Sequence, residues 1–295
     1  MTGDASATGD ASATSDAIGS APLAFCPTTI DVFGYSNVLN QGCGGVGPSP
    51  AAFADGLFAP GTLGYDRTLA GRLQARLAAD GELVARFGTA WKVRSCAAGG
   101  GTMATFVPTE QDPADQSGRT GRNVTMCTND PAPVILYSAN NVTDTFHGGG
   151  LGATPDDPSA YAAHWENRFE EFRQLRQPGA LLVSPQHEWH GEQTGSAGGD
   201  LEDCTWQRPR WNRSGLERWQ ANHPTVTEVV DVGDRQEEFK QHHSCCDVLG
   251  VACLPSWFDQ ADGWVHFDCQ GADALEEMWF GALRTYLVSH TFTCP

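Results

Sequence analysis

Short apolar runs alternate with amphipathic stretches along this chain. The apolar runs are rich in β-branched and aromatic residues, and their length is typical of strands rather than helices. They predict strands at residues 28–33, within 83–95, and at 133–137, 180–183 and 226–232. The runs at 133–137 and 180–183 are continuously apolar, which indicates strands buried on both faces of a sheet.

The stretches between these runs have the spacing of helices. Leu69, Leu73 and Leu77 recur at intervals of four residues, which predicts a helix. Asp66 is its expected cap and Gly81 its expected end. Further helices are predicted from Pro158, from Leu216, over 236–242 and over 272–287. The glycine-, proline- or polar-rich segments 37–64, 106–131 and 188–214 are predicted to be long irregular loops.

Strands that alternate with helices predict an α/β fold, in which a mostly parallel sheet lies between two helical layers. The carboxyl ends of parallel strands meet at one edge of the sheet, where ligands bind in such folds. Four unusual segments directly follow predicted strands and should gather at that edge. They are residues 34–36, 99–102, 138–141 and 184–187.

The chain of 295 residues is 40% hydrophobic, which is enough for a substantial core in one domain that we place at 22–295. Residues 1–21 repeat Gly-Asp-Ala-Ser-Ala-Thr twice and hold no large apolar side chain to bury between Met1 and Ile18, so we expect a disordered acidic tether. The net charge of -18 argues against nucleic acid and against anionic membranes as partners. No apolar run is long enough to cross a bilayer.

Cysteine usage indicates an oxidising compartment. The ten cysteines include no Cys-x-x-Cys pair, and an even number of this kind favours disulfides over zinc ligands. They stand at positions 26, 43, 96, 127, 204, 245, 246, 253, 269 and 294. Cys294 is expected to staple the carboxyl-terminal tail, and the adjacent Cys245 and Cys246 are expected to bond different partners. We therefore expect a secreted, periplasmic or surface-tethered protein whose native export signal has been removed.

A serine and a histidine at opposite ends of the chain are candidates for a catalytic pair. Ser36 follows the first predicted strand across the turn at Gly34, an arrangement that exposes a hydroxyl at the sheet edge. His266 stands just before the last predicted helix. A serine hydroxyl is a weak nucleophile at neutral pH, so it needs such a base within hydrogen-bond reach.

These segments together resemble the GDSL or SGNH hydrolase family over residues 28–290. Gly34-Tyr35-Ser36 resembles its first block, Arg94 to Thr102 its second, and Val134 to Asn141 its third, while His266 followed by Gly271 resembles its fifth. The resemblance implies a three-layer α/β/α fold of flavodoxin-like topology, with long disulfide-tied loops here. It also implies a serine esterase that needs no cofactor and no metal.

The resemblance assigns roles residue by residue. Ser36 is the implied nucleophile and His266 the general base. The implied oxyanion hole consists of the Ser36 amide, the Gly100 amide and the Asn140 side chain. The triad acid is Asp262 or Asp259; the family places it three residues before the histidine, where this chain has Gly263.

Other positions depart from the blocks. Tyr35, Ser138 and Asn141 replace the usual aspartate, glycine and aspartate. We expect Tyr35, Asn141 and His187 to line the substrate pocket. The expected reaction is hydrolysis of a carboxylic ester, either an acetylated carbohydrate or a short-chain acyl ester, through an acyl-serine. The degraded blocks keep open the alternative of a non-catalytic, carbohydrate-binding descendant of the fold.

Two histidine clusters suggest metal sites. His187-Glu188-Trp189-His190 offers three ligand types but lacks the spacing of a zinc helix. A metal-dependent hydrolase using His187 and His190 would lose its activity to chelators. His242-His243-Ser244-Cys245-Cys246 also resembles a metal cluster, although the even number of cysteines favours disulfides there.

Overall fold

The computed structural model of the chain describes a parallel sheet, helices on its two faces and parts of the connections. The described residues are 21–34, 38, 43, 64–97, 106–107, 127, 130–138, 158–184, 207–224, 227–229, 238, 241–242, 246–247, 250–257 and 267–295. The predicted tether lies outside them except for Ala21. Within the described residues, no helix is both long and apolar enough to cross a lipid bilayer.

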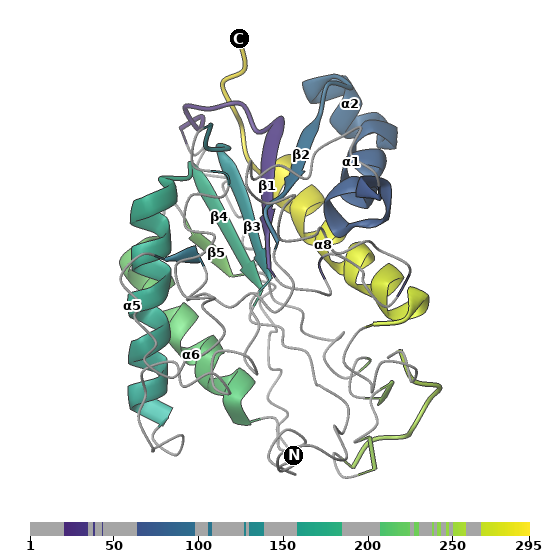
Figure 1. Cartoon of the computed structure of the whole chain (residues 1–295). Coiled ribbons are helices and arrows are strands. Elements are labelled where there is room, and N and C mark those ends of the chain that lie inside the picture. The colour runs from purple at the N-terminus through teal and green to yellow at the C-terminus, as the bar shows by residue number, and fades with distance from the viewer. Residues whose placement is uncertain are drawn as a thin grey trace, which may run out of the picture.

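A sheet of five parallel strands forms the middle layer (Figure 1). Its strands are β1 Thr29–Phe33, β2 Lys92–Ser95, β3 Val134–Ser138, β4 Ala180–Ser184 and β5 Thr227–Val229. They lie in the order β2-β1-β3-β4-β5. This order is that of flavodoxin-like sheets, so the predicted topology is confirmed. The all-parallel pairing also explains why β3 is buried along its whole length.

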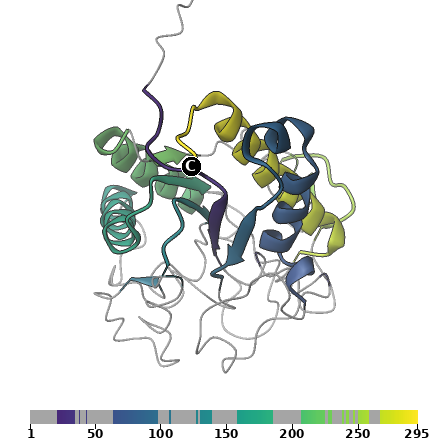
Figure 2. The ribbon, with the colours of Figure 1, turned by 90° about the horizontal axis from the view of Figure 1, so that it is seen from above.

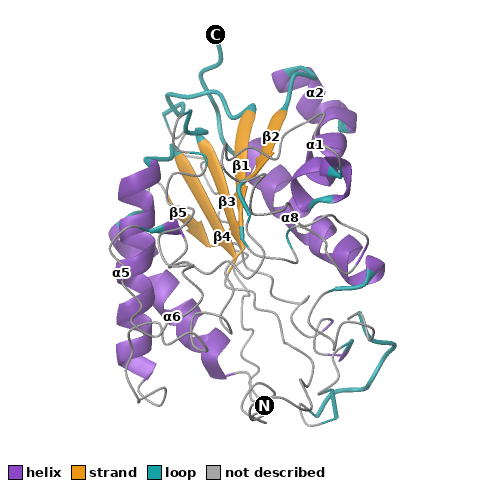
Figure 3. Ribbon diagram, viewed as in Figure 1, coloured by secondary structure: helices purple, strands orange, loops and turns teal. Residues whose placement is uncertain are grey.

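Helices cover both faces of the sheet, as Figures 2 and 3 show. The helices are α1 Leu69–Ala79, α2 Gly81–Phe87, α5 Pro158–Arg176, α6 Gln207–Asn222 and α8 Cys269–Ser289. On one face, Ile30, Val32 and Leu136 join α1 and α8 in a first hydrophobic cluster. On the other face, Phe33 and Tyr137 pack with residues of α5 and α6 in a second cluster. The predicted three-layer α/β/α fold is therefore confirmed.

The first helix is present, but its ends differ from the prediction. Thr68, and not Asp66, caps α1, because its hydroxyl accepts the Gly71 amide. Gly81 does not end the helical region, since α2 begins there. The Asp80 side chain accepts the amides of Glu82 and Leu83, and this cap makes residues 83–87 helical where the sequence pattern predicted extended chain.

Two other helices are longer than the prediction. α6 begins at Gln207 rather than at Leu216, so the predicted irregular segment 188–214 ends earlier than expected. α8 extends over Cys269–Ser289, with Leu275, Trp279 and Leu283 buried as predicted. The tail after α8 returns to the amino end of the fold, where Cys294 bonds Cys26 and confirms the predicted staple.

Candidate functional site

The order of the strands places a candidate site between the carboxyl ends of β1 and β3. The chain crosses from β1 to β2 on one side and from β2 to β3 on the other, so the strand order reverses between β1 and β3. Ligands of open α/β sheets bind at this kind of switch point. Among the described residues, Gly34 of the first block lies against Ser138 of the third.

Gly34 lies at this switch point and leaves no room for a side chain. Its φ of +154° favours glycine. A Cβ there would stand 2.5 Å from Cγ2 of Val38 and 3.2 Å from the carbonyl oxygen of Ser138. Gly34 is thus packed between the end of β3 and the chain that follows Ser36, which explains the glycine of the first block.

The described residues that flank Ser36 and His266 lie in one hydrophobic cluster. Val38, two residues after Ser36, is fully buried in the cluster beneath α1 and α8. Phe267, directly after His266, is buried in the same cluster. Val38 also accepts a hydrogen bond from the Leu69 amide, at 3.0 Å, which holds it against the start of α1.

A disulfide joins the same two regions covalently. Cys43, seven residues after Ser36, is bonded to Cys269, three residues after His266, and their Cα atoms are 4.6 Å apart. The residues between them in sequence include nearly the whole sheet. The chain after β1 and the first turn of α8 are therefore neighbours, although 226 positions separate the two cysteines.

The start of α8 is held from several directions. The Asp268 carboxylate caps the helix by accepting the amides of Gln270 and Gly271. The Asp268 amide donates to the Trp257 carbonyl at 2.7 Å. A Cβ on Gly271 would lie 2.6 Å from that same oxygen, so the glycine lets the Trp257 backbone approach the helix.

Trp257 itself belongs to a small disulfide-closed unit. Its ring stacks on the His242 imidazole with centroids 3.8 Å apart, and its amide donates to the His242 carbonyl. Cys246 bonds Cys253 within this unit. Cys246 therefore bonds a partner other than Cys245, as predicted, and its thiolate is not available to the metal cluster considered at 242–246.

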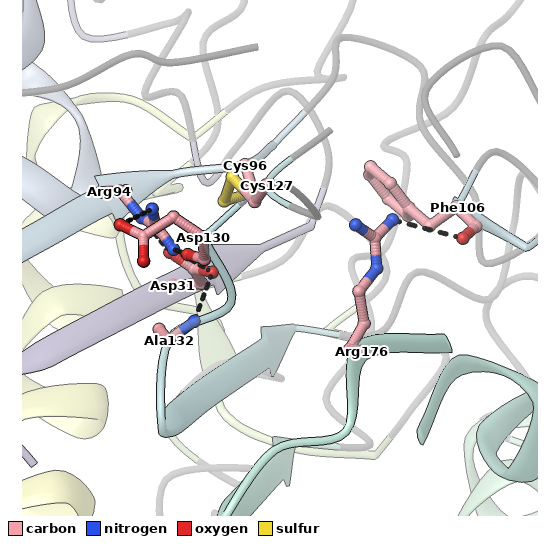
Figure 4. The surroundings of a disulfide bond; sticks show 8 residues. All are labelled: Asp31, Arg94, Cys96, Phe106, Cys127, Asp130, Ala132 and Arg176. Carbon is pink, nitrogen blue, oxygen red and sulfur yellow. Dashed lines mark hydrogen bonds and ion pairs between the residues drawn. A yellow bond between two sulfur atoms is a disulfide. The ribbon is translucent and has the colours of Figure 1, made fainter. Parts of the chain in front are cut away.

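Beneath the switch point, a buried ion pair fixes β1, β2 and the approach to β3 (Figure 4). Arg94 donates from Nε and Nη2 to the two carboxylate oxygens of Asp31, at 2.5 and 2.7 Å. The Ala132 amide approaches the same carboxylate at 3.4 Å, and Arg94 also contacts Asp130. Burial raises the pKa of Asp31, against the opposing effect of Arg94.

A second buried arginine holds the segment that follows the second block. Arg176, at the end of α5, donates to the carbonyl of Phe106 at 3.3 Å (Figure 4). Its guanidinium lies over the rings of Phe33 and Phe172. Burial lowers the pKa of Arg176 to about 10, although the Asp31 charge acts in the opposite direction.

The third feature shown in Figure 4 is the Cys96–Cys127 disulfide, which joins the end of β2 to the chain before β3. Asp31 and these two sulfurs lie within 4.8 Å of one another, and they are the one group of this kind among the described residues. Both sulfurs are in the disulfide, so they offer no thiolate to a metal. This group is a structural support, not a metal centre.

The predicted site residues themselves lie outside the described residues. This holds for Tyr35, Ser36, Gly100, Asn140, Asn141, His187, His190, Asp259, Asp262 and His266. Their roles stay predictions. Of the predicted departures from the blocks, Ser138 is described: it is the buried last residue of β3 and its carbonyl faces Gly34.

Sequence reasoning missed three supports of this site: the Asp31–Arg94 pair, the Cys43–Cys269 bond and the Trp257 carbonyl contact. A signal for the first was present, because Asp31 is a carboxylate within an otherwise apolar strand. The disulfide pairing had no such signal, since sequence alone does not define connectivity. The carbonyl contact requires a glycine at position 271, but a glycine does not identify which backbone approaches it.

The sheet order and the two helical layers define a three-layer α/β/α fold with flavodoxin-like topology. In a comparison with solved structures, the chain is similar to a GDSL-like lipase from Parabacteroides merdae, with a TM-score of 0.50 and 13% identity. The match covers 90% of this chain and 100% of that one. At this identity the likeness concerns the fold.

Two further solved structures are similar to the chain. One is LAE5, an α/β hydrolase from the metagenome of Lake Arreo, with a TM-score of 0.49, 14% identity, and coverage of 88% of this chain and 95% of that one. The other is Axe2, an acetylxylan esterase from Geobacillus stearothermophilus, with a TM-score of 0.45, 12% identity, and coverage of 88% and 96%. No protein-family model and no curated protein sequence matches the chain.

Proposed function

We propose that the chain is an exported serine hydrolase that cleaves carboxylic esters through an acyl-serine intermediate. The observation that carries the proposal is the Cys43–Cys269 disulfide, which joins the segment after Ser36 to the segment after His266. Val38 and Phe267 share one hydrophobic cluster, and Cys43 is bonded to Cys269. The described disulfides support export, because such bonds persist in oxidising compartments.

The proposed reaction has two halves. Ser36 attacks the ester carbonyl while His266 takes its proton, and His266 then returns the proton to the leaving alcohol. Water, deprotonated by His266, next attacks the acyl-serine, and the bond to Ser36 breaks as the serine oxygen takes that proton back and the acid leaves. Asp262 is the proposed acid that orients His266, with Asp259 as the other candidate. The amides of Ser36 and Gly100 and the side chain of Asn140 would bind the oxyanion, each donor contributing about 10²–10³ in turnover.

The proposed substrates are short-chain acyl esters, including acetylated carbohydrate, with Tyr35, Asn141 and His187 in the pocket. No metal and no organic cofactor is part of the proposed reaction. A chelator should therefore leave turnover unchanged. Loss of turnover on chelation, with recovery on adding zinc, would favour the metal-dependent alternative with His187 and His190.

The test is fluorophosphonate labelling followed by mass spectrometry, combined with p-nitrophenyl acetate turnover. We expect label on Ser36 in the wild type and loss of both label and turnover in Ser36→Ala. Ser289 is a matched control, since its exposed hydroxyl lies 3.0 Å from Nδ1 of His290 at the other end of α8. Ser289→Ala should change neither readout. Equal turnover by the wild type and Ser36→Ala, together with glycan binding, would instead favour the non-catalytic carbohydrate-binding descendant.

A further inference from the structure

The Cys43–Cys269 disulfide occupies a particular place relative to the proposed catalytic pair. One sulfur follows Ser36 by seven residues and the other follows His266 by three. The disulfide therefore joins the two segments that must meet if the hydroxyl and the imidazole exchange a proton. Its position sets it apart from the other described disulfides, none of which joins these two segments.

On the α8 side, the disulfide is attached to a well-fixed support. Asp268 caps the helix with its side chain and donates its amide to the Trp257 carbonyl at 2.7 Å. Gly271 contacts the same carbonyl so closely that a Cβ would stand 2.6 Å from it. Cys269 lies between these two residues, so its position follows from theirs.

On the other side, the disulfide is attached to the long connection between β1 and α1. Val38 is buried, and its carbonyl accepts the Leu69 amide. Among the described residues, Cys43 alone stands between Val38 and Gly64, and its described contact is the bond to Cys269. Within the described residues, this disulfide is the covalent link between that connection and the start of α8.

A second disulfide provides an internal comparison. Cys26–Cys294 spans 268 positions, against 226 for Cys43–Cys269, and both bonds have a solvent-exposed half-cystine in α8 or its tail. The entropy of loop closure grows only with the logarithm of loop length, so the two bonds should stabilise the fold by similar amounts. The Cys26–Cys294 bond lies near the amino end of β1, at the edge of the sheet opposite the candidate site.

We propose that Cys43–Cys269 is a positioning cross-link for the catalytic pair, and this inference rests on the proposed function. The two cysteines act through Ser36 and His266 without touching the substrate. Proton transfer needs the serine oxygen and the imidazole nitrogen within about 2.6–3.2 Å, and a misplacement of about 1 Å can cost 10²-fold in rate. Opening this disulfide should therefore slow the reaction far more than it weakens substrate binding.

The experiment compares three full-length proteins: the wild type, Cys43→Ser/Cys269→Ser and Cys26→Ser/Cys294→Ser. We measure kcat and KM for p-nitrophenyl acetate, the rate of fluorophosphonate labelling, and Tm. Both variants should lose Tm to a similar extent. Only Cys43→Ser/Cys269→Ser should lose about 100-fold in kcat, with KM little changed and labelling slowed in parallel.

Several outcomes would overturn the inference. An active wild type with equal kcat in both variants contradicts the cross-link alone and leaves the proposed function standing. A wild type that neither turns over the ester nor takes the label contradicts the proposed function, and the cross-link falls with it. If Cys43→Ser/Cys269→Ser fails to fold, the folded Cys26→Ser/Cys294→Ser protein is partly reduced instead. Alkylation and mass spectrometry then identify which of its disulfides have opened. Activity that survives opening of Cys43–Cys269 then overturns the inference.

Discussion

Asp31 and Arg94 face each other at matching positions of the parallel β1–β2 pair and form a two-pronged ion pair with both side chains only 1% exposed. The same carboxylate is approached by the Ala132 amide just before β3. One buried charge pair therefore sets the alignment of the strands that carry the first and second blocks, and it reaches the entry to the third. The position of the candidate site depends on this alignment.

We predict that Arg94→Met destabilises the fold by about 3–5 kcal/mol, because it leaves the Asp31 carboxylate buried without its partner. The double variant Asp31→Leu/Arg94→Met should recover most of that loss, since neither charge then remains buried. Denaturant unfolding of the two variants and the wild type measures both values.

Lys92→Met is the matched control for this prediction. Lys92 is in the same strand and pairs with Asp130 at 3.3 Å, but its side chain is 50% exposed. An exposed pair contributes about 0–1 kcal/mol, so this variant should be nearly neutral. A double variant as unstable as Arg94→Met would contradict the assigned role of the pair.

Gly34→Ala should destabilise the protein by about 1–3 kcal/mol and reduce ester turnover. The substitution combines an unfavourable φ with a clash against Val38 and the Ser138 carbonyl, directly beside the switch point. Gly88→Ala is the control, since Gly88 also has positive φ, +78°, but open space where a Cβ would stand. Thermal unfolding and turnover of both variants separate backbone strain from the contact. Equal losses in both would exclude a role for the contact.

Two glycines of α8 should respond in opposite directions to alanine. Gly281 is exposed within the helix with no atom within 4 Å of a built Cβ, so Gly281→Ala should stabilise by about 0.5–1 kcal/mol. Gly271→Ala should destabilise by about 1–3 kcal/mol, because its Cβ would press on the Trp257 carbonyl and on Phe267. Chemical denaturation distinguishes the two, and a stabilised Gly271→Ala protein would show that Trp257 does not approach the helix closely.

Glu170 should make part of the stability depend on acid pH. Hydrogen bonds from Arg173, and then from Trp219 and Gln174, lower the pKa of Glu170 to about 2 from an ordinary value of 4.5. Because this pKa is lower in the folded state, the ionised Glu170 stabilises the fold above pH 4.5. This stabilisation is lost as the pH falls towards 2. Glu170→Gln should therefore cost about 1–2 kcal/mol at neutral pH, and progressively less below about pH 4.5.

Unfolding of the wild type and Glu170→Gln at about pH 7 and about pH 3 measures this difference. Glu166→Gln is the control on the same helix, since its partner Arg218 is 52% exposed and the pair should contribute about 0–1 kcal/mol. A cost of Glu170→Gln that stays constant between the two pH values would contradict the assigned hydrogen bonds.

Much of the architecture of this protein could be predicted from its sequence because β1, β3 and β4 are short, mostly apolar runs and the segments of α1 and α8 have a helical period. The runs at 133–137 and 180–183 correspond closely to β3 and β4. One error falls where a single side chain decides the local structure. Asp80 turns the next residues into α2, although their apolar spacing is also compatible with a strand.

The candidate site was predicted less completely, for a physical reason. The blocks identify residues that would do the chemistry, and these are short motifs at strand ends. The supports are long-range relationships, such as Cys43 with Cys269 and Asp31 with Arg94. No periodicity or local spacing encodes a partner that lies far away in sequence.

The tail that follows α8 has a practical consequence for handling this protein. Leu23 pairs with Phe292 in a β-bridge, and Cys26 is bonded to Cys294. These contacts hold the tail beside the segment that leads into the first strand. A bead, dye or fusion partner coupled at the carboxyl-terminal tail would therefore sit at the amino edge of the sheet, away from the carboxyl ends of the strands.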